Sequence, residues 1–189
     1  MYFSALAFSD MEDHLRQIVA ARSAGRGDAR GLRILLPFDG SQASEHAARY
    51  VARSLAGTQA SVVLLNAQQP ILDDPALLHS AGAIVAAHRA AGDRVLGVAR
   101  GILEAEGVAC ASEVAFGPAV EAIVKAADAR RCALVVMGTR GRHALVNLFT
   151  GSVPSRVVQR SPVPVMLIRH QMQGLLRMPR QPSAPFIAA

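Results

Sequence analysis

The chain has 189 residues, of which 51% are hydrophobic and 18% are charged, and its formal net charge is +6. This length suits one domain with extensions better than two domains, and such a domain can bury an ordinary hydrophobic core. No apolar run reaches the roughly 18 to 20 residues of a membrane span, and no basic secretion signal opens the chain, so we expect a cytoplasmic protein without a membrane partner.

The charges are unevenly distributed along the chain. No carboxylate follows Asp128, whereas arginines continue from Arg130 to Arg180. The C-terminal part is therefore expected to present a surface that attracts anions. Because aromatic residues make up only 4% of the chain and no nucleic-acid recognition module is evident, we do not expect nucleic acid as a partner.

Cysteine and histidine are too scattered to suggest a metal site. Cys110 and Cys132 fall in or beside predicted strands, where a free cysteine usually serves as a small buried hydrophobe. The six histidines form no pair at the i, i+4 spacing, and the cysteines form no C-x-x-C motif. We therefore predict no metal ligands.

The N-terminal half alternates between helix and strand signals. Ser9 and Glu12 have the spacing of a capping box, which predicts a short amphipathic helix before the flexible segment 25–31. Segment 33–39 (RILLPFD) is the first predicted strand, and segment 60–67 is the second. Between them, a helix is expected to begin at Ser41 and end at Gly57, because alanine, valine and leucine recur there at helical spacing.

The remaining elements continue this alternation. Asp74-Pro75 predicts the start of a helix that reaches about Glu106, in which four glycines favour a break or a mobile first part. Strands follow at 108–115, 133–138 and 163–169, with helices after Gly117-Pro118 and from about Ser152 to Arg160. Pro162 and Pro164 indicate that the last strand lies at an edge. The order predicts an α/β fold with an open, mostly parallel five-stranded sheet and helices on both faces.

The segment 138–152 (GTRGRHALVNLFTGS) carries the most specific pattern. Gly138, Gly141, Gly151 and Ser152 form G-x2-G-x9-G-S, which lies between a strand and a helix. Glycines allow main-chain N–H groups to approach an anion, and a helix N-terminus adds unpaired donors and positive potential. The pattern differs from the Walker A loop and from the dinucleotide fingerprint, but it also predicts a phosphate site.

With this pattern, the chain resembles the ATP-binding branch of the universal stress protein family. The segment LLPFDGS, with Pro37 and Asp39, is similar to the first strand of that family. The resemblance covers residues 32–169, so 1–31 is expected to be an N-terminal extension and 170–189 a basic, flexible tail. It implies a Rossmann-like fold of the adenine nucleotide alpha hydrolase type and a homodimer formed through the edge strand from Val163 to Arg169.

The resemblance also implies a ligand and the residues that hold it. The ligand would be ATP, with or without Mg²⁺, and Asp39 beside Pro37 would hold the ribose or adenine. The backbone near Ala67 would contact the adenine edge. The phosphates would be bound by the motif residues Gly138, Gly141, Gly151 and Ser152. Arg142 would be a further donor to them.

Several of these residues have an ordinary structural interpretation as well. Asp39 could form an Asx turn, Ser41 is better explained as a helix cap than as a ligand contact, and Arg142 could be a solvated loop charge. Val163, Val165 and Leu167 could be ordinary core instead of a dimer interface. Because no catalytic residue is predicted, we expect a stress-response or signalling protein in which the bound nucleotide controls contacts with an unknown protein partner. A slow ATP hydrolase and an interaction module without nucleotide remain the alternatives.

Overall fold

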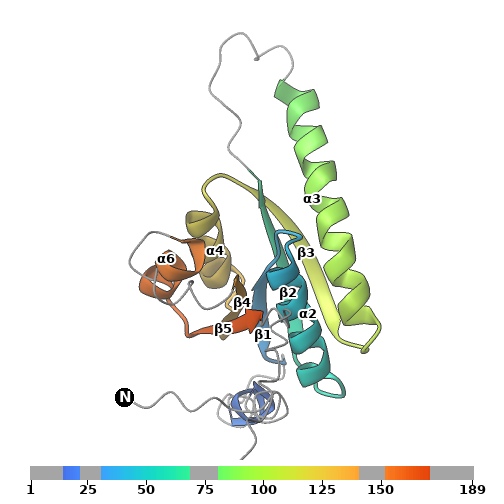
Figure 1. The fold of residues 1–189 in the computed structure, drawn as a ribbon, viewed down its shortest axis with the longest axis vertical. Helices are drawn as coiled ribbons and strands as arrows, with labels where there is room; N and C mark the ends of the chain where they lie inside the picture. Colours follow the sequence, from blue (N-terminus) through green and yellow to red (C-terminus); the bar gives the residue numbers. More distant parts are fainter. Residues whose placement is uncertain (1–14, 22–30, 69–80, 141–151, 171–189) are drawn as a thin grey trace, which may run out of the picture.

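The structure is a computed structural model that describes residues 15–21, 31–68, 81–140 and 152–170. Its strands and helices alternate along the chain, as the sequence predicts (Figure 1). The elements are β1 (Arg33–Pro37), α2 (Gln42–Leu55), β2 (Ser61–Gln68), α3 (Ala81–Glu104), β3 (Ala109–Phe116), α4 (Ala119–Ala129), β4 (Leu134–Arg140), α6 (Val153–Arg160) and β5 (Val165–His170).

The five strands form one open parallel sheet in the order β3-β2-β1-β4-β5. β1 lies at its centre, where Ile34 is level with Val62 of β2 and with Leu134 of β4. The chain therefore adds β2 and β3 on one side of β1 and then β4 and β5 on the other side. The winding direction reverses between β1 and β4. In open α/β sheets, ligands bind at such a reversal, beyond the carboxyl ends of the strands. The predicted sheet and the edge position of the last strand are both confirmed.

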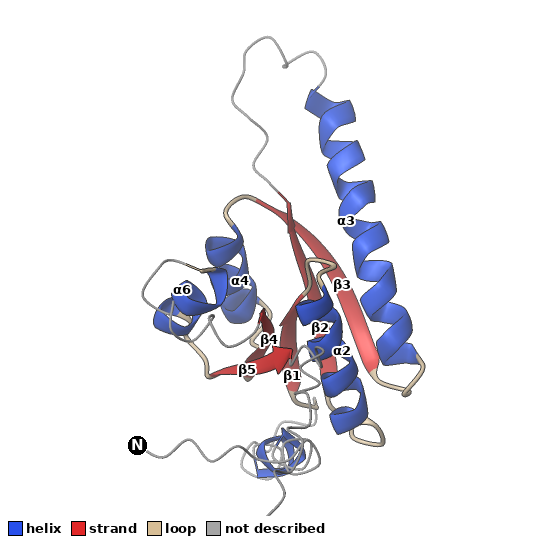
Figure 2. Ribbon diagram, in the orientation of Figure 1, coloured by secondary structure: helices blue, strands red, loops and turns tan. Residues whose placement is uncertain are grey.

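Helices cover both faces of the sheet (Figure 2). α2 and α3 pack on one face, and α4 and α6 pack on the other. β1 and β2 are continuous apolar runs because each is covered on both faces. Their alternate residues contribute to two separate core clusters, since Ile34 and Leu64 face α2 and α3 while Leu35 and Val63 face α4.

The glycines of α3 do not break the helix. The helix is continuous from Ala81 to Glu104, so the expected break is absent there, and the expected start at Asp74-Pro75 lies outside the described residues. Gly97 is exposed, with space for a side chain, whereas Gly92 is buried against Val114. Packing on β2 and β3 outweighs a cost of about 1 kcal/mol for each glycine.

A short helix over residues 15–21 packs against the main domain. Leu15 and Val19 are buried in the same core cluster as β1 and α2. The guanidinium of Arg16 donates to the main-chain oxygens of Arg53 and Ser54, at 2.9 Å and 3.1 Å. A cation near the last carbonyls of α2 is favourable, because those groups carry the negative end of the helix dipole. The predicted capping box at Ser9 and Glu12 lies outside the described residues.

Candidate functional site

The chain leaves β1 through a tight turn at the reversal point. The main-chain N–H of Ser41 donates to Oδ1 of Asp39 at 2.9 Å, which closes an Asx turn. Gly40 has φ +78°, a conformation that glycine adopts without strain. The structural interpretation of Asp39 is therefore correct. The turn also holds one carboxylate oxygen in a defined position at the carboxyl end of β1.

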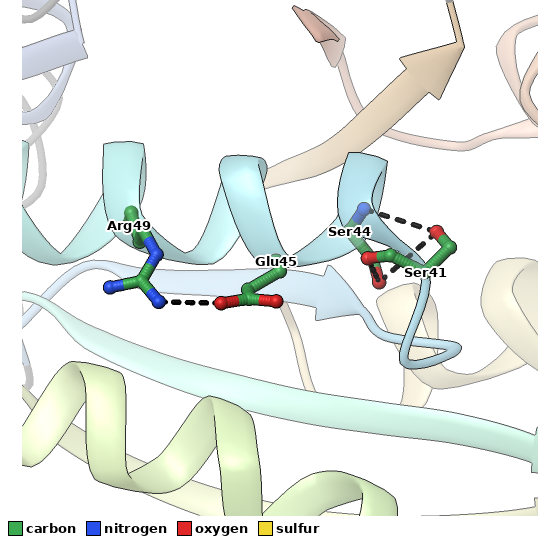
Figure 3. Close-up of polar contacts among 4 residues, drawn as sticks. All are labelled: Ser41, Ser44, Glu45 and Arg49. Atoms are coloured by element: carbon green, nitrogen blue, oxygen red, sulfur yellow. Dashed lines mark hydrogen bonds and ion pairs between the residues drawn. The ribbon is translucent and has the colours of Figure 1, made fainter.

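Ser41 caps α2, as predicted. Its hydroxyl oxygen accepts from the N–H of Ser44 at 3.3 Å, and the Ser44 hydroxyl donates to the Ser41 carbonyl at 2.9 Å (Figure 3). One turn further along, Glu45 and Arg49 form an exposed i, i+4 ion pair worth a few tenths of a kcal/mol. The caps leave the start of α2 firmly placed beside Asp39.

The carboxylate of Asp39 is stabilised in its charged form. Partial desolvation raises the pKa of Asp39, but hydrogen bonds from Ser41 and Ser44 outweigh it and leave the pKa below its ordinary value of 3.8. Hydrogen bonds to the ionised form account for this direction. Asp39 therefore remains an anion and a hydrogen-bond acceptor at neutral pH, and it loses this charge only in more acidic solution than an ordinary aspartate does.

Gly138 has a different immediate role from the one its motif position suggests. β4 continues to Arg140 instead of ending at Gly138, so Gly138 lies within a strand. A Cβ atom at Gly138 would lie 2.0 Å from the carbonyl oxygen of Ala43 and 2.8 Å from the N atom of Ser44. Glycine is therefore required here for the close approach of α2 to β4.

A cavity of about 150 Å³ lies at the carboxyl ends of β1, β2 and β4. Asp39, Ser41 and Ser44 supply its polar side chains, and most of the remaining lining is apolar. The lining consists of Pro37, Phe38, Asp39, Ser41, Ser44, Leu65, Ala67, Ala119, Ile123, Met137, Gly138, Val153 and Pro154.

Three helices begin at this cavity. Ser41 and Ser44 belong to the start of α2, Ala119 is the first residue of α4, and Val153 is the first residue of α6. Ser152 is the N-cap of α6, and in the described part of the chain its hydroxyl makes no capping hydrogen bond. Helix N-termini present N–H donors and positive potential. The cavity can therefore accept an anionic group at its margin and an apolar group inside.

The structure brings together half of the predicted site residues. Pro37, Asp39, Ala67 and Gly138 all line the cavity. Ser152 directly precedes the lining residue Val153. The other three, Gly141, Arg142 and Gly151, lie outside the described residues, so the phosphate loop itself stays a prediction.

The apolar lining was not predicted. Leu65, Ile123 and Met137 come from β2, α4 and β4. In the sequence, their spacing is that of ordinary core residues. The only signal was their place at or near the carboxyl end of a strand or the start of a helix, which becomes specific once the strand order is known.

Several arginines of the C-terminal part of the chain are paired with carboxylates and are therefore less available to an anionic ligand than the composition implies. Arg160 and Arg156 lie 2.6 Å and 3.8 Å from Glu121 Oε1, and Arg130 lies 2.8 Å from Glu113. The hydrogen bond from Arg160 lowers the pKa of Glu121. These pairs join distant parts of the chain and are partly exposed, so each is worth little in stability. They nevertheless occupy arginines that the sequence suggested were available to a ligand.

Residues 32–169 match the family model described as the universal stress protein family. The chain belongs to the universal stress protein family. A universal stress protein of Thermus aquaticus is 47% identical over 53 residues, which are 28% of this chain and 39% of that protein. One from Synechocystis is 29% identical over 135 residues, 71% of this chain and 83% of that protein.

Solved structures of the family share the fold. A universal stress protein family member from Burkholderia pseudomallei has 29% identity and a TM-score of 0.58, and the match covers 75% of this chain and 98% of that one. A universal stress protein in complex with cAMP has 23% identity and a TM-score of 0.55 over 73% of this chain and 96% of that one. A member from Arabidopsis thaliana with AMP bound has 18% identity and a TM-score of 0.53 over 75% and 93%.

No helix in the described ranges is long and apolar enough to cross a membrane. The longest of these helices, α3, carries arginines and Asp93 along its length.

Proposed function

We propose that the chain binds an adenine nucleotide, ATP in particular, in the cavity between the carboxyl ends of β1 and β4. The observation that carries this proposal is the combination at one place of Asp39, an apolar interior and three helix N-termini. A nucleotide has the matching parts, namely an apolar base, a ribose with hydroxyl donors and an anionic phosphate chain. Two structures of this fold contain AMP or cAMP, which supports the same class of ligand.

The cavity and the ligand fit in a particular orientation. The cavity of about 150 Å³ is smaller than the ~300 Å³ at the low end of ligand pockets, so it suits the nucleoside end of the molecule. The base would lie against Leu65, Ala67 and Met137, and the ribose hydroxyls would donate to Asp39. The phosphates would extend toward Ser152 and the start of α6. Asp39 is the one carboxylate among the cavity-lining residues described, so Mg²⁺ would arrive with the phosphates instead of occupying a protein site.

Photolabelling tests whether ATP enters this cavity. After irradiation with 8-azido-ATP and digestion with trypsin, we expect label on the peptides 54–89 and 132–140, which contain Leu65, Ala67 and Met137 at the proposed position of the base. Excess ATP should remove the label, whereas excess inorganic phosphate should not. Label confined to other peptides, or label that ATP does not displace, would contradict the proposed site. Release of ADP during the incubation would identify the chain as a slow hydrolase.

We further propose that the nucleotide-bound chain acts as a homodimer that contacts a partner protein. β5 is paired with β4 on one side only, and an unpaired strand edge is a ready surface for a second copy. Val163, Val165 and Leu167 pack partly against the core on the α4 side, so they serve the core whatever else they do. Sedimentation velocity should detect a dimer, and a chain that stays monomeric at high concentration with ATP would exclude this arrangement.

A further inference from the structure

A buried amide lies next to the candidate site without lining it. Asn66 is 4% exposed, and it alternates in β2 between the cavity-lining residues Leu65 and Ala67. Successive side chains of a strand point to opposite faces, so Asn66 faces α2 and α3. Its Nδ2 donates to the main-chain oxygen of Phe38 at 2.8 Å. Asn66 therefore holds the peptide immediately before Asp39.

The orientation of this amide is set by its neighbours. Nε2 of Gln68 donates to Oδ1 of Asn66, and Nδ1 of His88 in α3 lies 3.5 Å from Oε1 of Gln68. Because the Asn66 oxygen faces the Gln68 donor, its NH₂ group is directed to Phe38. The resulting chain of contacts runs from α3 across the end of β2 to the turn after β1.

The absence of a side chain in α3 makes room for this arrangement. A Cβ atom at Gly92 would lie 3.0 Å from Oδ1 of Asn66 and 2.8 Å from the methyl carbons of Val114. The helix therefore approaches Asn66 at a distance that a larger residue would prevent.

A second contact holds the same peptide segment. The N–H of Phe38 donates to the carbonyl oxygen of Leu65 at 2.8 Å. β2 thus fixes Phe38 through both its N–H and its carbonyl group. Asp39 follows directly, so the direction of its carboxylate relative to the cavity depends on how this peptide is held.

We propose that Asn66 is a positioning residue, which holds the Phe38 carbonyl and thereby directs the Asp39 carboxylate toward the ribose of the bound nucleotide. This inference rests on the proposed function. Asn66 touches no part of the nucleotide and acts only through the turn. The donor on Nδ2 is the essential feature, because the carbonyl needs a hydrogen-bond partner in that buried place.

The substitution Asn66→Asp tests the donor directly. At pH 8 the introduced carboxylate has no proton to donate, and it faces the Phe38 oxygen, so ATP affinity measured by calorimetry should be about tenfold weaker than in the wild type. At pH 5.5 the buried carboxyl group should be protonated and donate again, because burial favours its neutral form. The difference from the wild type at the same pH should then shrink to about threefold or less. An equal deficit at both pH values, or none, would overturn the proposal.

Two further variants separate positioning from general stability. Val62→Ala removes two buried methyl groups from the same face of β2, four residues before Asn66, and it should leave ATP affinity unchanged at both pH values. Gln68→Ala alters a half-buried residue and should fold even if Asn66→Asp does not. By releasing the Asn66 amide, it should weaken ATP binding about threefold. Unchanged affinity in Gln68→Ala would count against the proposal.

A measurement without nucleotide keeps the two proposals distinct. Amide hydrogen exchange of Ser41, whose N–H is bonded to Asp39, should be faster in Asn66→Asp at pH 8 than in the wild type, relative to the exchange of Leu64. If the wild type does not bind ATP, the proposed function fails, and Ser41 exchange alone decides whether Asn66 positions the turn. Unchanged Ser41 exchange would show that it does not.

Discussion

Replacing Gly138 by alanine should destabilise the protein by about 3 kcal/mol or more. The new Cβ would lie 2.0 Å from the carbonyl oxygen of Ala43 and 2.3 Å from its carbon. Both atoms belong to the main chain of α2, so the clash cannot be relieved by rotating a side chain. α2 would have to move away from β4, and its core contacts would be lost. Thermal unfolding should show a melting temperature lower by roughly 6–12 °C.

Gly97→Ala is the matched control for this substitution. Gly97 is exposed in the middle of α3, and no neighbouring atom in the described part of the chain lies within 4 Å of its added Cβ. Alanine should therefore leave the protein equally stable or more stable by up to about 1 kcal/mol, because it favours helix. A Gly138→Ala protein as stable as Gly97→Ala would show that the contact between α2 and β4 is looser than the structure has it.

Replacing Asp39 by alanine should weaken ATP binding by about 10- to 100-fold, which corresponds to a charged hydrogen bond worth about 1.5–3 kcal/mol. The substitution removes both the proposed acceptor for the ribose and the Asx turn that shapes the entrance of α2. Because the pKa of Asp39 lies below 3.8, the effect should be constant between pH 5 and 8. Titration calorimetry at two pH values checks both statements.

Asp39→Asn separates the two roles of this residue. The asparagine oxygen can still accept from the N–H of Ser41, so the turn is retained, but the negative charge is lost. Its loss of ATP affinity should fall between those of the wild type and Asp39→Ala. Wild-type affinity in both variants would remove Asp39 from the binding site.

Much of the fold follows from local sequence patterns. The alternation of apolar runs with helical spacing predicts the order of elements, and Pro162 and Pro164 correctly indicate an edge. β5 begins at Val165, directly after these prolines, because proline cannot donate to the sheet. Ser41 is recognisable as a cap because it sits between turn residues and a helical pattern.

Features that depend on distant contacts could not be predicted in this way. The role of Gly138 in packing is set by Ala43, about a hundred residues earlier in the chain, and no local spacing records that approach. Similarly, the pairing of Glu121 with Arg160 appears only when α4 and α6 lie together. The continuity of α3 shows the same limit, because helix propensity penalises its glycines while tertiary packing retains the helix.

The candidate site also contains residues that the local sequence predicts and residues that become evident only from distant contacts. The family resemblance assigns Asp39 and Gly138 to one ligand site, and both residues line the cavity at the carboxyl ends of β1 and β4. Asn66 was missed, since an asparagine at the end of an apolar strand carries no local sign of a hydrogen bond to Phe38. The hydrogen bond from Asn66 to Phe38 becomes evident only when β2 and the turn after β1 lie side by side.

Titration calorimetry of the wild-type chain with ATP shows whether the cavity at the carboxyl ends of β1 and β4 binds an adenine nucleotide. We expect saturable binding of one ATP per chain with a dissociation constant near the micromolar range, which corresponds to a binding free energy of about −8 kcal/mol. GTP should bind more weakly, because the base contacts would be altered. An absence of binding heat at millimolar ATP, at two temperatures and with protein shown to be folded, would mean that the chain does not bind ATP in this cavity.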